Sequence, residues 1–192
     1  MEEKYKYIRF FKEIGVDDVA VVGGKTSSVG EMYRELTPQG VKVANGFAIT
    51  AAAYRYILDK ASAWDALHEA LEGIDASNMA DLANRGRKAR AIVYGAPLPD
   101  DLKQEILAAY QTLQGEYGHD LSVAVRSSAT AEDLPNVSFA GQHESYLNIY
   151  GDVSCLSTLV NAALPAFSPT ALSITALTRG STTSRCTSPL QS

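Results

Sequence analysis

The chain has 192 residues and 46% of them are apolar, which is enough for one domain of ordinary size, or two small lobes, around a real core. Its formal net charge of −5, from 17 basic and 22 acidic residues, disfavours a broad basic surface that would wrap a nucleic-acid backbone. Only two cysteines occur, so a disulfide framework is not indicated. The charged start lacks the apolar run of a signal peptide or membrane anchor. The sequence therefore predicts a soluble, cytoplasmic protein with neither a nucleic-acid nor a membrane partner.

Strand-like and helix-like segments alternate from residue 19 onward. The run VAVVGG at 19–24 is short, β-branched and closed by two glycines, which predicts a buried strand ending in a tight turn. Apolar residues then recur at helical spacing over 29–36, where Ser27 or Ser28 can cap the helix. A second short strand is expected at 46–50.

The same pattern continues to residue 150. Thr50 can cap a helix at its start, and two prolines break the chain before a stripe of apolar residues across five helical turns. The expected elements are helices within 51–60, 63–72, 78–93 and 100–117, and strands at 121–128 and within 138–149. The fold class is therefore α+β (α/β), with helices packed on a small mixed sheet.

Residues 151–192 differ in character from the rest. The first 150 residues hold 15 of the 17 basic and 21 of the 22 acidic residues, whereas serine and threonine supply 15 of the last 42. Because no sustained apolar period survives there, the sequence predicts a flexible tail that is disordered over most of 165–192. We therefore expect a folded domain at 1–150 and a separate Ser/Thr-rich tail at 151–192.

The first candidate site is GGKTSS at 23–28, between the expected strand and helix. Glycines let the backbone approach a phosphate, N–H groups at a helix start attract anions, and Lys25 adds a positive charge. A complete P-loop would need a glycine five residues before Gly24, but that position is Val19. The motif therefore leaves two interpretations open, a phosphate site or a plain turn with a solvated lysine.

The second candidate is VAVRSSATAEDLPNVSFAGQHES at 123–145. A buried-looking strand delivers Arg126, whose forked donors suit phosphate oxygens, into a run of hydroxyl residues. Arg126 can equally pair with Glu132 or Asp133 in a polar connector. Gly141 either lets the backbone lie against a ligand or only bends a strand.

Together, GGKTSSVGEM, NGFAIT and RSSATAEDLP…SFAGQ resemble the N-terminal nucleotide-binding part of the phosphoenolpyruvate synthase (pyruvate, water dikinase) family, over about residues 10–151. Pyruvate phosphate dikinase and rifampicin phosphotransferase share this kind of domain. The resemblance implies the first part of an ATP-grasp-like domain, with ATP as ligand and Mg²⁺ as its metal. In the family, ATP phosphorylates a histidine on a swivelling domain, releasing AMP and phosphate, and the phosphohistidine then phosphorylates pyruvate on a third domain.

The resemblance also assigns roles to individual residues. Lys25 matches the lysine on the ATP phosphates, and Arg126 matches the arginine that stabilises their charge and so carries the catalytic role. Gly141 matches the glycine whose backbone meets the nucleotide, and Ser145 stands where some relatives have a threonine. Such a pair of cations fits phosphoryl transfer, because positioning and charge neutralisation do most of that work.

Several family features are not found in these 192 residues. No segment resembles the acidic and glutamine-containing strands that complete the family's ATP site and hold magnesium, so no metal ligand is expected in this chain. The phosphohistidine domain and the pyruvate-binding barrel are also missing, so pyruvate is a partner only through absent domains. Surfaces meant for the missing lobe would be exposed, which predicts self-association.

The tail suggests an origin for this truncation. Residues 168–185 correspond to a charged, aromatic segment of the family read one base out of phase, so we hypothesise a frameshift that the coding DNA can test. The expected function is an ATP-binding fragment of a pyruvate, water dikinase that is inactive alone. The alternatives are a fragment of a rifampicin-type phosphotransferase, a nucleotide-binding module without catalysis, and a product that never folds stably.

Overall fold

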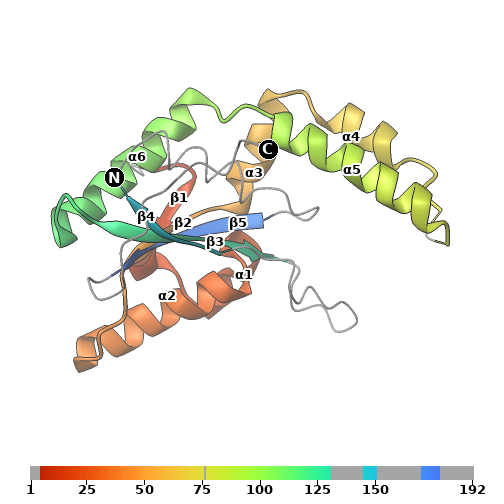
Figure 1. The fold of residues 1–192 in the computed structure, drawn as a ribbon. Coiled ribbons are helices and arrows are strands. Elements are labelled where there is room, and N and C mark those ends of the chain that lie inside the picture. Colours follow the sequence, from red (N-terminus) through yellow and green to blue (C-terminus); the bar gives the residue numbers. More distant parts are fainter. Residues whose placement is uncertain (1–4, 76, 131–144, 151–169, 178–192) are drawn as a thin grey trace.

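The sheet at the centre of the protein has five strands in the order β1–β2–β5–β3–β4, in a computed structural model that describes residues 5–75, 77–130, 145–150 and 170–177 (Figure 1). Every pairing among these strands is antiparallel. The strands are β1 (Ile8–Phe10), β2 (Gly46–Ile49), β3 (Ser122–Ala129), β4 (Ser145–Tyr150) and β5 (Thr170–Leu177). Since β2 and β3 both pair antiparallel with β5, they run in the same direction, and their C-terminal ends meet at one end of the sheet.

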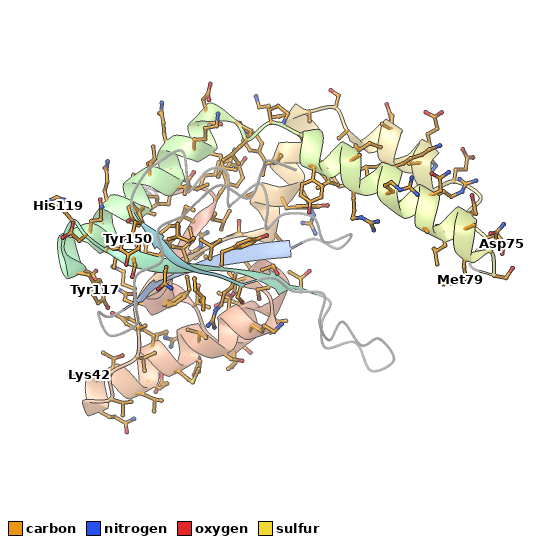
Figure 2. All side chains as sticks on the ribbon, viewed as in Figure 1. Lys42, Asp75, Met79, Tyr117, His119 and Tyr150 are labelled. Carbon is orange, nitrogen blue, oxygen red and sulfur yellow. The ribbon has the colours of Figure 1, made fainter. Side chains whose placement is uncertain are left out.

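Helices lie on both faces of this sheet (Figure 1). They are α1 (Val19–Val22), α2 (Gly24–Leu36), α3 (Ala51–Lys60), α4 (Trp64–Leu71), α5 (Met79–Gly95) and α6 (Asp100–Tyr117), with short 3₁₀ turns at Phe11–Glu13, Val16–Asp18 and Thr37–Gln39. The antiparallel pair α4 and α5 extends away from the sheet as an arm, and Figure 2 places Asp75 and Met79 at its tip.

The main core lies between one face of the sheet and helices α3 and α6. Period-two alternation puts Phe47 and Ile49 of β2, and Val123 and Val125 of β3, on this face, where all four are buried. The stripe predicted on α6 meets them with Leu102, Ile106, Tyr110 and Leu113, which are buried as well. Burial of each large apolar side chain contributes about 1.5–3 kcal/mol, so this layer holds the fold together.

A smaller cluster lies on the opposite face of the sheet, where α1 and α2 pack. It consists of Phe11, Ile14, Val22 and Ala48, with Val29 and Tyr33 of α2 against it. Gly30 allows α2 to approach this closely, because a Cβ atom there would lie 2.6 Å from the Ile14 side chain. The side chains of β2 and β3 that point away from the main core therefore face α1 and α2.

One expected strand is a helix. The run at 19–24 forms α1 and the first residue of α2, separated by Gly23, whose φ of +79° disfavours any residue with a side chain. Of its valines, only Val22 is buried, and Val21 is exposed. A short apolar run does not reveal its own period, and this one lacks the two-sided burial of a central strand. The strand predicted at 46–50 and the helices predicted over 29–36, 51–60 and 100–117 are confirmed.

Two further expectations need correction, although the α+β class is confirmed. The sheet is antiparallel throughout its described strands, not mixed. The disorder expected over most of 165–192 is wrong for Thr170–Leu177, because β5 is the central strand, bonded to both β2 and β3. The rest of the tail lies outside the described residues. In the arm, Trp64 at the start of α4 is 45% exposed.

Candidate functional site

The GGKTSS motif forms the N-terminus of α2. The positive φ of Gly23 ends α1 and lets α2 begin at Gly24, so Lys25 is the second residue of the helix and is exposed. Ser27 and Ser28 do not cap the helix as expected, because both hydroxyls donate to the Gly24 carbonyl at 3.0 Å. The first N–H groups of a helix carry a partial positive charge, and Lys25 adds a full charge beside them.

A long-range hydrogen bond joins this helix start to the second candidate motif. The backbone N–H of Thr26 donates to Ser128 Oγ at 3.3 Å, across 102 positions of sequence, and both residues are 1% exposed. Ser128 stands two residues after Arg126 on β3. The two segments that the sequence marked as candidates are therefore in direct contact at one end of the sheet.

Arg126 lies on the face of the sheet that α1 and α2 cover. Val125 points into the main core, so its neighbours along β3 in the alternation, including Arg126, point to the other face. In register, Arg126 stands opposite Ser173 of β5, which in turn stands opposite Ala48 of β2. Ala48 packs against α1 and its neighbours in the smaller cluster. The guanidinium is exposed on this side.

Ser145 is the direct cross-strand partner of Arg126. The two residues are paired in the antiparallel ladder between β3 and β4, so they lie on the same face with Cβ atoms about 4.5–5.5 Å apart. Farther along this ladder the register shifts between Val123 and Val125, where Asn148 on β4 has a φ of +58°. This bulge keeps Ile149 buried while leaving the Arg126–Ser145 pair in register.

Three of the four predicted site residues are thus on one side of the sheet. Lys25, Arg126 and Ser145 come from α2, β3 and β4, and the Thr26–Ser128 hydrogen bond fixes the first two elements relative to each other. Gly141 lies outside the described residues, as do Glu132 and Asp133, the alternative partners of Arg126. The roles assigned to the four residues remain predictions.

Two threonines that sequence analysis did not assign to the site have unusual hydroxyl groups. Within the part of the chain that the structure describes, Thr26 Oγ1 and Thr50 Oγ1 are buried and have no hydrogen-bond partner. An unsatisfied buried polar group of this kind costs about 1–3 kcal/mol. Thr50 occupies the N-cap position of α3 as predicted, yet its side chain makes no capping bond among these residues. Sequence pattern cannot reveal such orphaned atoms, because they depend on tertiary burial.

This donor set fits a phosphate group. It combines the N–H groups at the start of α2, buried threonine hydroxyls and two basic side chains on one face of the sheet, all of which donate to or attract anionic oxygens. An anion of this kind needs no apolar pocket. The side of the protein where α2 begins is therefore its best candidate for binding a phosphorylated ligand.

A large pKa shift occurs away from this site, at the contact between α3 and α6. Tyr56 donates its hydroxyl hydrogen to Asp101 Oδ2 at 2.5 Å, and this bond raises the pKa of Tyr56 to about 12. The same bond lowers the pKa of Asp101 below its ordinary value of 3.8. These groups stabilise the packing of the two helices and are not part of the candidate site.

Comparison with known proteins identifies the family of this chain. Residues 19–183 match the family described as pyruvate phosphate dikinase, AMP/ATP-binding domain. The chain belongs to this family. The match includes the start of α2, the whole of β3 and also β5, so the central strand of the sheet is within the family domain.

The chain is similar to several phosphoenolpyruvate synthases. The chain is 45% identical to the enzyme of Helicobacter pylori over 169 residues, which cover 88% of this chain and 21% of the relative. It is 41% identical to the Aquifex aeolicus enzyme over 166 residues, covering 86% and 19%. With the Synechocystis enzyme the identity is 46% over 154 residues, covering 78% and 19%. The chain thus corresponds to an AMP/ATP-binding domain and spans about one fifth of the length of these relatives.

One negative observation concerns membranes. Among the described residues, the helices are too short or too polar to serve as a membrane-crossing segment.

Proposed function

We propose that this chain is the ATP-binding part of a phosphoenolpyruvate synthase, and that Lys25 and Arg126 hold the phosphates of the nucleotide. The observation that carries the proposal is the hydrogen bond from Thr26 to Ser128, because it fixes the residue after Lys25 against the strand that bears Arg126. A helix start and two cations then serve one anion. The family match supports a nucleotide as that anion, since it is to an AMP/ATP-binding domain.

The remaining site residues extend this proposal. Ser145, paired with Arg126 across the ladder, would contribute its hydroxyl to the same ligand, and the backbone of Gly141 would meet the nucleotide. The fold would be the first part of an ATP-grasp-like domain. Magnesium would accompany ATP, with its protein ligands outside these 192 residues.

The reaction of a complete relative would convert ATP, pyruvate and water into phosphoenolpyruvate, AMP and phosphate through a phosphohistidine. In that reaction Lys25 and Arg126 would neutralise the charge that develops on the transferred phosphoryl group. The chain covers about a fifth of the relatives' length, for example 21% of the Helicobacter pylori enzyme, and we propose that it binds ATP without turnover. This reaction would take place in the cytoplasm and serve gluconeogenesis.

Calorimetric titration with ATP and magnesium tests the proposal. We expect micromolar binding by the chain and a loss of about tenfold or more, equivalent to about 1.4 kcal/mol, in both Lys25→Ala and Arg126→Ala. The matched controls are Lys42→Ala and Arg87→Ala, which remove exposed cations elsewhere; Figure 2 shows Lys42 beyond the far end of α2. Binding that neither site variant weakens would contradict the proposal, as would pyruvate-dependent release of AMP by this chain alone.

A further inference from the structure

The two orphaned threonine hydroxyls mark the N-termini of two different helices. Thr26 is in the first turn of α2, a helix of 13 residues, and Thr50 is the N-cap of α3, a helix of 10 residues. Their side chains are buried, with 1% and 4% of each residue exposed. Neither hydroxyl has a partner in the described part of the chain, although an N-cap threonine ordinarily accepts a hydrogen bond from its own helix.

The strand register places Thr50 at the same end of the sheet as the candidate site. Ile49 of β2 and Ser127 of β3 both stand opposite Leu172 of β5, so they lie in one row across three strands. Thr50 follows Ile49 by one residue, just as Ser128 follows Ser127. Thr50 and Ser128 are therefore level with each other, two strand spacings or about 10 Å apart.

The two residues also belong to the same face. Ile49 points into the main core, and the backbone of Thr50 is still extended, with φ −72° and ψ 162°. The alternation of the strand therefore continues through Thr50 and puts it on the face of Ala48, Arg126 and Ser128, toward α1 and α2. Thr50, at the N-terminus of α3, and the N-terminus of α2 thus converge on one end of the sheet, where Thr50 faces α1 and α2 while the rest of α3 packs on the main-core face.

We propose that Thr50 and the N-terminus of α3 form a second phosphate contact in the nucleotide site, facing the contact made by Lys25 and the start of α2. The Thr50 hydroxyl donates to a phosphate oxygen, and the first N–H groups of α3 point at the same anion. This inference rests on the proposed function, because it assigns a further binding residue to the same nucleotide. It also accounts for both orphaned hydroxyls, since Thr26 and Thr50 lie at the two helix ends that the ligand joins.

Replacing the hydroxyl of Thr50 by a methyl group tests the inference. In Thr50→Val we expect ATP affinity, measured calorimetrically with magnesium, to fall by about tenfold. The thermal unfolding midpoint of the ligand-free variant should be unchanged or higher, because valine has the same shape and leaves no hydroxyl unsatisfied. Thr50→Ser, which keeps the hydroxyl, should bind ATP within about twofold of the parent chain.

The outcomes separate this inference from the proposed function. If Lys25→Ala weakens ATP binding while Thr50→Val leaves it unchanged, the second contact does not exist and the proposed function stands. A loss of affinity that is equal in Thr50→Ser and Thr50→Val, together with a lower unfolding midpoint in both, would show a purely structural role and overturn the inference. Absence of ATP binding by the parent chain would overturn both. Thr50→Ala is measured in parallel, so that a folding defect in one variant leaves the other to decide.

Discussion

Removing the hydrogen bond between Thr26 and Ser128 and measuring stability tests whether the start of α2 is held against β3. In Ser128→Ala the buried N–H of Thr26 loses its acceptor, and among the described residues no other acceptor is bonded to it. An unsatisfied buried N–H costs about 1–3 kcal/mol, and the length of 3.3 Å places this bond in the weaker half of that range. We therefore expect a loss of about 1–2 kcal/mol in the free energy of unfolding.

For a chain of this size, 1 kcal/mol corresponds to about 2–4 °C in the unfolding midpoint, so the expected decrease is roughly 2–8 °C. Urea unfolding and differential scanning calorimetry both measure it. The control is Ser28→Ala, which removes an exposed hydroxyl that donates to the nearby Gly24 carbonyl and should change stability by no more than about 0.5 kcal/mol. If the two variants unfold at the same midpoint, the start of α2 is not held against β3 and the argument for a shared site is wrong.

Three further predictions concern packing, pH and association. In Gly46→Ala the new Cβ would lie 2.2 Å from a backbone carbonyl oxygen of β5, so we expect the free energy of unfolding, measured in urea, to fall by more than about 3 kcal/mol. In the control Gly86→Ala, in α5, the new Cβ meets only the flexible tip of an arginine at 3.4 Å, so we expect stability to rise by up to about 1 kcal/mol. The Tyr56–Asp101 bond stabilises the fold between pH 3.8 and pH 10, and it weakens as the pH falls through the lowered pKa of Asp101 or rises through about 12. In Tyr56→Phe we expect the pKa of Asp101, measured by carboxyl NMR titration, to return toward 3.8, and the loss of stability in acid to become less steep. An unchanged pKa of Asp101 would contradict this. Leu147 is 55% exposed on β4, the last strand of the described sheet, so we expect the chain to self-associate and Leu147→Lys to reduce that association, as measured by sedimentation velocity. A chain that is monomeric at all concentrations would refute this.

Sequence reasoning located most helices because their apolar spacing was long and regular. The stripe on α6 spans five turns, and four of its five members are buried as the spacing predicts, whereas Tyr117 at the end is 39% exposed. The strand predicted at 19–24 was wrong for the opposite reason, because this run is short. Four apolar residues fit either period, and the preceding 3₁₀ turn at Val16–Asp18 continues directly into a helix.

The central strand β5 was not predicted, because the Ser/Thr-rich composition of the tail indicated disorder although its apolar and polar residues alternate. Residues 170–177 read TALSITAL, in which Leu172 and Ile174 alternate with Ser173 and Thr175. This period of two is typical of a strand with one buried face, and Ile174 is fully buried. Its place between β2 and β3 also depends on residues more than 40 positions away along the chain. Local sequence cannot specify such a pairing. Whether residues 168–185 are read out of frame stays a prediction for the coding DNA.

The candidate site was predictable in its residues but not in its geometry. Lys25 and Arg126 carried recognisable chemistry, and the family resemblance linked them. Nothing in either motif indicated that Ser128 accepts a hydrogen bond from Thr26, or that Thr50 faces the same side of the sheet. Those facts follow from the direction of β2 and β3 relative to β5, which only the folded chain defines.

A crystal structure of the chain with a non-hydrolysable ATP analogue and magnesium tests the central claim most directly. The account predicts that one phosphate chain lies within hydrogen-bond distance of both the Lys25 ammonium and the Arg126 guanidinium, at the start of α2. A nucleotide seated on another surface, or one whose phosphates meet only one of these two cations, would contradict it.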